Sequence, residues 1–245
     1  MKVAILGCGP AGLLAAHAVK LRGHVPVILS MKVKSEVPGA QFIHRSIPGI
    51  HHSIPDGRVE IRFIGNNTGY AKKVYGNPDA ETSWGVFTGT LGIWSMRDTY
   101  RRLWDMYESC IDEYKIDAES AASINHPMVV STIPLRSICL KPGEHTFDSQ
   151  PVWIEPGVEP SGNGNLIIYN GNPDHPWYRW SSLFEQTSYE FAHEPENPKP
   201  HTVCVQKPLR TNCDCHPRFH RAGRYGEWKK AVLVHQAFRK VYNAL

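Results

Sequence analysis

The chain has 245 residues, of which 41% are hydrophobic and 20% are charged. This length and composition are typical of a protein with a sizeable buried core, and they exclude a disordered chain, a coiled coil and a collagen-like fibre. The net charge of +4 favours anionic ligands such as nucleotides, but it falls short of the strongly basic surface of a dedicated nucleic-acid binder. No apolar run is long enough to cross a membrane.

The N-terminal residues have the pattern of a strand, a helix and a second strand. Buried strands are predicted over 2–6 and 25–29, with a helix over 10–22 between them. This order of elements predicts a parallel sheet with a right-handed crossover.

The glycine-rich sequence GCGPAG, residues 7–12, joins the first strand to the helix. The first glycine of such a loop allows a tight turn, the second lets the backbone approach a pyrophosphate, and the third lets the helix pack closely on the strand. The start of the helix then offers free amide N–H groups to the phosphates, and proline suits its first turn. We therefore predict that a dinucleotide is bound here, and the expected contacts are Gly7, Gly9, Pro10, Ala11 and Gly12.

The end of the second strand leaves the choice of dinucleotide open. An acidic residue usually stands there and binds the ribose hydroxyls, whereas this chain has Ser30, which hydrogen-bonds a hydroxyl more weakly. Lys32 and Lys34 follow, and unless they are simply solvated they favour a 2′-phosphate. NADP is therefore an alternative cofactor.

The remaining pattern predicts a nucleotide-binding core that is assembled from both ends of the chain. Residues 31–92 and 143–165 are rich in turn-forming residues and weakly patterned. Strand-like alternation is expected at 59–64 and 70–75, an amphipathic helix at 96–114, strands at 127–134 and 166–170, and a terminal helix at 227–244. We expect a core of residues 1–40, 93–140 and 201–245, with substrate-facing insertions at 41–92 and 141–200.

Three later segments resemble parts of known flavoproteins. Residues 128–134 (MVVSTIP) resemble the strand that returns to the cofactor in amine-oxidase-like flavoproteins. Residues 166–191 are similar to a substrate-domain stretch of UDP-galactopyranose mutases, and residues 223–228 (GRYGEW) resemble the closing flavin-binding motif of that family. The resemblance implies a compact FAD-dependent oxidoreductase whose fold is α/β: a Rossmann-like FAD-binding domain with an inserted β-rich substrate region.

The resemblance also implies which residues hold the FAD. A glycine loop that opens the last helix directs amide groups at the negative charge of a reduced flavin. Beyond the N-terminal loop, the expected FAD contacts are Ser30, Gln41, Thr132, Gly223, Arg224, Tyr225, Gly226 and Trp228.

Arg179 stands among aromatic residues, where a guanidinium group can clamp a phosphate or carboxylate. The resemblance places Arg179 near substrate and flavin, and neighbouring aromatic rings can stack on a base or cover the flavin. His44 follows the second strand at the point where such folds approach the flavin. The expected catalytic residues are Arg179, His44 and Tyr178. His51 and His52 are further candidate bases, although an isolated histidine is more often structural.

The six cysteines are irregularly spaced and no secretory signal precedes the first strand, so reduced thiols and a cytoplasmic protein are expected. Cys213, Cys215 and His216, together with His220, are ligand types that zinc prefers. All of them lie in one short stretch, however, and Cys204 joins them only if the chain folds back. We therefore expect no metal site.

Several functions remain open at this stage. The first is an FAD-dependent oxidoreductase that acts on a small amine- or nucleotide-type substrate. The second is a flavoenzyme that modifies a hypermodified base in phage DNA, because basic and aromatic residues interleave at 97–104 and 177–180 and the compact chain resembles viral enzymes. The others are a module that keeps FAD without turnover and an NADP-binding oxidoreductase.

Overall fold

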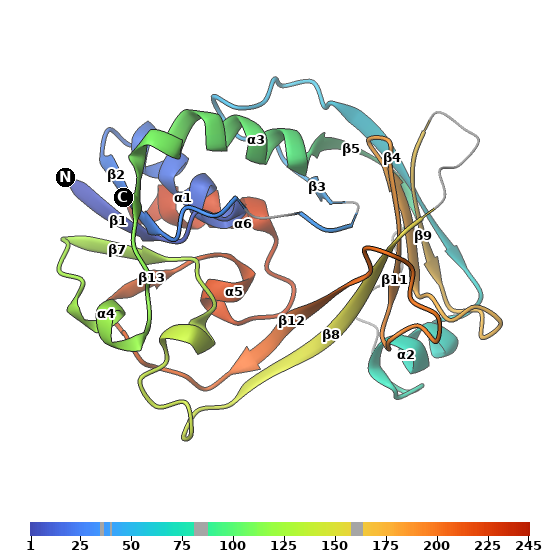
Figure 1. Ribbon diagram of the computed structural model, residues 1–245. Helices are drawn as coiled ribbons and strands as arrows, with labels where there is room; N and C mark the ends of the chain where they lie inside the picture. The colour runs from blue at the N-terminus through green and yellow to red at the C-terminus, as the bar shows by residue number, and fades with distance from the viewer. Residues whose placement is uncertain (35–36, 40, 81–87, 158–163) are drawn as a thin grey trace.

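The computed structural model describes residues 1–34, 37–39, 41–80, 88–157 and 164–245. Two sheets organise these residues (Figure 1). Sheet A is fully parallel and has the spatial order β13-β7-β1-β2-β6. Its strands are β1 (Lys2–Leu6), β2 (Val25–Ser30), β6 (Ile111–Glu113), β7 (Met128–Ser131) and β13 (Phe219–Arg221).

Both faces of sheet A are buried, as expected for parallel strands. Val3 and Ile5 pack toward three helices, and Ala4 and Leu6 face the opposite layer. The three helices are α1 (Pro10–Leu21), α3 (Met96–Tyr107) and α6 (Val234–Ala244). The opposite layer contains α4 (Ala118–Ser123), the 3-10 turn η2 (Leu135–Ile138) and α5 (Gly223–Glu227). This arrangement is the predicted Rossmann-like core.

Sheet B has the order β12-β8-β11-β10-β9-β4-β5-β3, and all of its pairs are antiparallel except β4 with β9. It is the β-rich region predicted from the sequence. Its strands are β3 (Phe42–Ile43), β4 (Gly57–Ile64), β5 (Gly89–Ser95), β8 (Phe147–Pro156), β9 (Asn165–Asn170), β10 (Arg179–Leu183), β11 (Gln186–Phe191) and β12 (Val203–Thr211).

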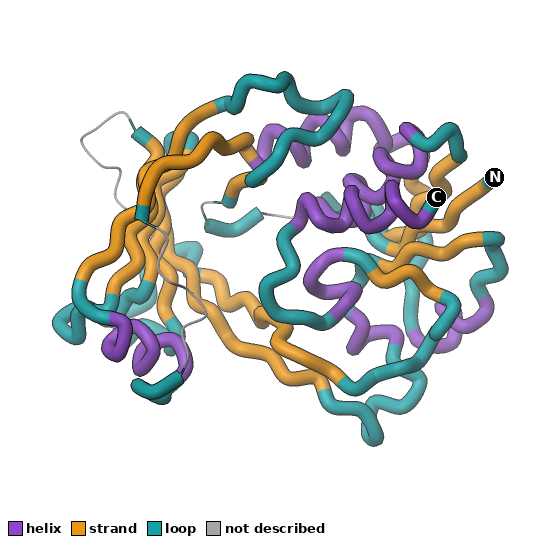
Figure 2. The backbone as a smooth tube through the Cα atoms, turned by 180° about the vertical axis from the view of Figure 1, so that it is seen from behind, coloured by secondary structure: helices purple, strands orange, loops and turns teal. Residues whose placement is uncertain are grey.

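Two connections join the sheets. On one side β5 runs directly into α3 at Ser95, whose hydroxyl accepts the N–H of Asp98 and caps the helix. On the other side β8 and β12 form a long antiparallel pair that extends from sheet B to the underside of the core (Figures 1 and 2). We call this pair the two-stranded arm. Because β12 belongs to sheet B, this sheet includes residues 203–211, which were expected to belong to the core segment 201–245.

The region expected to alternate as a strand at 70–75 is instead the helix α2 (Asn67–Tyr75). The Asn66 side chain accepts the Gly69 N–H at 2.7 Å and caps its start, and Gly76 ends it with a left-handed backbone at φ 70°. Local capping therefore overrides the apolar alternation.

Two predicted helices are shorter than their patterns. The helix expected over 96–114 ends at Tyr107, and after the 3-10 turn η1 (Glu108–Cys110) the chain continues as β6, in which Ile111 pairs with Ile28. The terminal helix expected over 227–244 is shorter as well, because only α6 and the last residue of the preceding helix α5 fall in this range. Trp228 ends α5 in a left-handed conformation at φ 48°, and α6 begins only at Val234. The glycine motif therefore opens a helix of one turn and not the last helix.

The weakly patterned stretch at 143–165 contains β8, a ten-residue strand that pairs with both β11 and β12. Pairing with two neighbours stabilises this strand without a regular apolar pattern. No helix among the described residues is both long and apolar enough to cross a bilayer.

Candidate functional site

The site is built at the carboxyl ends of β1 and β7, which are neighbours in sheet A. The chain leaves β1 toward α1 on one face, whereas it leaves β7 toward η2 on the other face. Ligands of open α/β sheets bind in the crevice at such a change of direction. Gly7 and Thr132 follow the two strands directly, so the predicted loop and the predicted Thr132 meet at this edge.

The glycine loop requires its glycines for close contacts. A Cβ atom on Gly12 would lie 2.0 Å from the carbonyl oxygen of Gly7, and Gly7 itself has φ +100° and would place a Cβ 2.8 Å from Ile133 Cγ2. Gly9 caps α1 with an extended backbone, and no side chain of the described residues caps the first turn of this helix. Its leading N–H groups are therefore left for a ligand.

The closing motif packs directly on this loop. Gly223 has φ +76° and a Cβ built on it would lie 2.7 Å from Ala11 Cβ, while a Cβ on Gly226 would lie 2.4 Å from the Ser131 carbonyl oxygen. The N-terminal loop, the end of β7 and the closing motif thus meet in space, as the sequence resemblance implies. Ser131 is fully buried and its hydroxyl has no hydrogen-bond partner among the described residues.

The other expected cofactor contacts lie in different surroundings. The Thr132 hydroxyl donates to the Leu6 carbonyl at 2.8 Å and packs on the loop. Ser30 ends β2 beside Glu113, and Gln41 is exposed. The Trp228 indole N–H donates to the Asp148 carbonyl at 3.0 Å, and its ring packs on that of Phe147.

Two further cationic side chains bear on the choice of cofactor and on the charge beside the closing motif. Lys34 is one of the two lysines that favour NADP, and its ammonium group lies 5.5 Å from the centre of the Trp104 ring. Since α5 has a single turn, positive charge beside the motif comes mainly from Arg224 and not from a long helix dipole.

A buried polar cluster lies on sheet B around Glu190, which is 3% exposed. Arg179 forms a short ion pair with its carboxylate, Lys207 Nζ lies 3.2 Å from Oε2, and the Tyr178 hydroxyl donates to Oε2 at 2.7 Å. We call Arg179, Tyr178, Glu190 and Lys207 the Glu190 cluster. The Nε atom of Arg179 is buried without a partner among the described residues.

Charge links the Glu190 cluster to the closing motif. Burial raises the pKa of Glu190, but Arg179 and Lys207 outweigh burial and hold this pKa at about 2. Burial lowers the pKa of Arg224, and the charges of Arg179 and Glu190 also act on it. The N–H of Lys230, just after α5, donates to the Leu209 carbonyl of β12 at 2.9 Å. Two cationic side chains therefore contact one carboxylate, and the charge of Arg224 acts on the same cluster, so that the excess of positive charge favours an anionic ligand.

The histidines are placed differently. His44 is exposed, with ring neighbours Phe42 at 4.4 Å and His235 at 5.7 Å between ring centres. His51 accepts the Ile47 N–H at 2.9 Å and contacts the Thr99 hydroxyl at 2.7 Å, and burial lowers its pKa to about 4. His51 is therefore a neutral structural residue.

Two features of the site differ from the sequence-based picture. Tyr100 and Trp104, the aromatic residues of the stretch at 97–104 that supported the DNA-modifying alternative, are only 3% and 6% exposed and belong to the core of sheet A. Conversely, Glu190 and Lys207 were not predicted as site residues. Glu190 is paired with Arg179 across the β10–β11 hairpin, and Lys207 reaches Glu190 because β11 and β12 lie on either side of β8 in the sheet.

Comparisons with known proteins show similarity of fold. A crystal structure of reduced UDP-galactopyranose mutase matches with a TM-score of 0.57 and 12% identity, over 99% of this chain and 92% of that chain. HpxO of Klebsiella pneumoniae, in complex with FAD and uric acid, matches with a TM-score of 0.45 and 11% identity over 98% and 83% of the two chains. CtdE, in complex with FAD and a substrate, has a TM-score of 0.45 and 11% identity over 80% and 58%. Neither the protein-family models nor the curated protein sequences give a match.

Proposed function

We propose that the protein is an FAD-dependent oxidoreductase that acts on an anionic substrate of nucleotide type. The observation that carries this proposal is the contact of Gly223 with Ala11 and of Gly226 with Ser131, which joins two glycine motifs at the edge of sheet A. The pyrophosphate of NADP or of FAD needs only the first motif, whereas a second motif beside it suits the isoalloxazine ring that FAD carries.

In this proposal each group of residues has a definite task. The loop at Gly7–Gly12 and the uncapped start of α1 bind the pyrophosphate. Arg224 supplies positive charge at the closing motif, where a reduced flavin would be negative. A bound flavin would supply the electron-transfer chemistry, which explains why no separate catalytic dyad is needed.

Arg179 and Lys207 would bind the anionic part of the substrate from the side of sheet B. Glu190 holds both cations in place, and Arg224 adds a third positive charge nearby. An amine substrate is protonated near neutral pH and would be repelled by this excess of cations. The charge of the cluster therefore favours the nucleotide-type substrate over the amine.

The first experiment is purification of the full chain and identification of its chromophore. We expect a yellow protein that releases FAD on acid denaturation, identified by mass spectrometry. A colourless protein that binds NADP would favour the alternative cofactor, and flavin that no substrate or dithionite reduces would favour a module without turnover.

The second experiment tests the anionic substrate by titrating nucleotides and sugar nucleotides into the flavoprotein and following its visible spectrum. Lys207→Gln should weaken the spectral response while FAD remains bound. Arg210→Gln is the matched control, because Arg210 lies on the same strand but is exposed and pairs with Asp148 at 2.6 Å. Equal responses of the two variants would contradict the assignment.

A further inference from the structure

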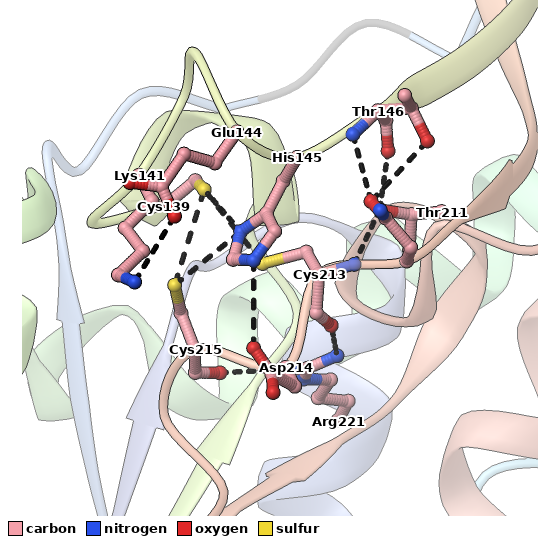
Figure 3. A network of polar contacts seen from close by, with 11 residues as sticks. Cys139, Lys141, Glu144, His145, Thr146, Thr211, Cys213, Asp214, Cys215 and Arg221 are labelled. Atoms are coloured by element: carbon pink, nitrogen blue, oxygen red, sulfur yellow. Dashed lines mark hydrogen bonds and ion pairs between the residues drawn. The ribbon is translucent and has the colours of Figure 1, made fainter.

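A cluster of three cysteines and one histidine lies outside the proposed flavin site. Its residues are Cys139, His145, Cys213 and Cys215, and their ligand atoms all lie within 4.8 Å of one another. The three cysteines are buried and the His145 side chain is 12% exposed. Figure 3 shows the three sulfur atoms and the imidazole ring turned toward a common point.

The distances between these atoms fit one tetrahedral ion. Zinc–sulfur and zinc–nitrogen bonds of about 2.3 and 2.0 Å place two sulfurs about 3.8 Å apart and a sulfur and a nitrogen about 3.5 Å apart. The sulfur atom of Cys139 lies 3.7 Å from that of Cys213 and 4.0 Å from that of Cys215. His145 Nδ1 lies 3.2 Å from the Cys139 sulfur and 3.6 Å from that of Cys215.

The surroundings are those of a supported metal site. The second nitrogen of His145, Nε2, lies 3.5 Å from Asp214 Oδ1, and metal-binding histidines commonly direct their second nitrogen at a carboxylate. Arg221 donates to the carbonyl of Cys213 at 2.8 Å and to that of Cys215, which holds the Cys-Asp-Cys turn. His216 contacts the Ile138 carbonyl at 2.7 Å and joins the two ligand-bearing segments.

We propose that Cys139, His145, Cys213 and Cys215 bind one structural zinc ion. Three thiolates and one imidazole form a closed ligand set that leaves no open position for a substrate. This proposal reverses the expectation drawn from the sequence, which considered only Cys204 and the residues near Cys213. Cys204 is exposed on β12, while the missing ligands come from the segment before β8.

The ion would fasten the base of the two-stranded arm. His145 stands just before β8 and Cys213 just after β12, so the metal ties together the points at which both strands leave the core. Trp228, the last residue of the closing motif, packs in the same buried cluster as the three cysteines. The zinc therefore stabilises the segment that brings Gly223 and Gly226 to the glycine loop.

The test is elemental analysis of the full chain, purified without chelator. We expect about one zinc per chain, as for a four-ligand structural site. Cys139→Ser and Cys215→Ser should lose the ion, while Cys204→Ser and Cys110→Ser, which change exposed cysteines outside the cluster, should retain it. His145→Cys should also retain zinc, whereas His145→Ala should bind it weakly or not at all.

Two further measurements keep the proposal testable if a variant fails to fold. Replacement of the native ion by cobalt in the unaltered protein should produce the intense visible bands of tetrahedral thiolate coordination, at longer wavelength than the absorption of an oxidised flavin. Asp214→Asn should keep the ion but release it to a competing chelator at an affinity about 10-fold lower, because Asp214 only positions His145.

Several outcomes would overturn the zinc site. They are substoichiometric zinc in protein grown with zinc, a disulfide between Cys139 and Cys213 or Cys215, and equal zinc in the ligand and control variants. Metal content is measured independently of flavin, so a zinc-loaded protein without FAD would refute the proposed function and leave this inference standing.

Discussion

A side chain at Gly9 should prevent cofactor binding without preventing folding. The backbone of Gly9 is extended, at φ −67° and ψ 177°, so any residue can adopt its conformation. We predict that Gly9→Val folds but is colourless, because the side chain occupies the space into which the pyrophosphate must come. Flavin absorbance and circular dichroism measure the two properties, and Gly143→Ala, at a glycine with open space around it, is the control. A fully yellow Gly9→Val protein would show that the loop does not bind the cofactor.

Glu190 should give the folded protein a characteristic acid sensitivity. Its pKa of about 2 lies below the ordinary value for a glutamate, so its ionised form stabilises the fold at pH values above the ordinary pKa. This contribution is lost as the pH falls from about 4.5 toward 2, and the shift corresponds to about 3 kcal/mol of unfolding free energy. Urea unfolding at a series of pH values measures it.

Glu190→Gln is the variant that isolates this effect. It leaves Arg179 and Lys207 buried without a carboxylate, so it should lower the stability at pH 7 by about 3–5 kcal/mol. The variant should also lose the part of the pH dependence that belongs to Glu190. An unchanged acid profile in Glu190→Gln would assign the sensitivity to other carboxylates.

At the scale of elements, the contact of α5 with the start of α1 should control flavin affinity. Gly223→Val introduces a side chain at φ +76° and against Ala11, so α5 must move away from the loop. We expect a folded protein with weakened FAD binding, measured by equilibrium dialysis.

Gly76→Ala is the matched control for Gly223. It has a similar backbone, at φ +70°, with no atom near the added Cβ. This control should cost about 1 kcal/mol of stability and leave FAD binding unchanged. Equal effects of both substitutions on FAD binding would show that the closing motif is only a strained turn and does not bind the flavin.

The last helix should be indispensable because it covers α1. Ala237, Phe238 and Val241 of α6 are buried in the core of sheet A. Phe238→Ala should lower the unfolding free energy by about 3–5 kcal/mol through loss of buried surface and creation of a cavity. Arg239→Ala, the exposed neighbour, should change it by less than about 0.5 kcal/mol in thermal or urea unfolding. Similar losses in both variants would show that α6 is not anchored by this face.

At the scale of the whole molecule, cofactor binding should stabilise the chain. A ligand that binds only the folded state adds about 2.7 kcal/mol at 100 times its dissociation constant. For a chain of this size that corresponds to a rise in melting temperature of roughly 5–10 °C. Differential scanning fluorimetry of the apoprotein with added FAD measures the rise, and Gly9→Val should not show it. An equal rise with NADP and none with FAD would reverse the choice of cofactor.

The sequence by itself determined the local parts of this protein. The strand–glycine loop–helix unit, the strand at Met128 and the closing glycine motif are recognisable because their signals lie within a few neighbouring residues. Apolar runs indicate buried segments, and glycines indicate turns whose backbone conformation other residues rarely adopt. These signals were sufficient to predict the Rossmann-like core and the β-rich region beside it.

Only the tertiary structure decided which distant residues meet. Glu190 meets Arg179 because the two residues are cross-strand partners in the β10–β11 hairpin. Lys207 reaches Glu190 because β11 and β12 both pair with β8, whose pattern was too weak to predict a strand. In the same way, the sulfur atoms of Cys139 and Cys213 are 3.7 Å apart, although 73 residues separate the two cysteines in the chain. The sequence does not encode such a pair locally, since strand pairing and the packing of the two sheets fix the distance between these residues.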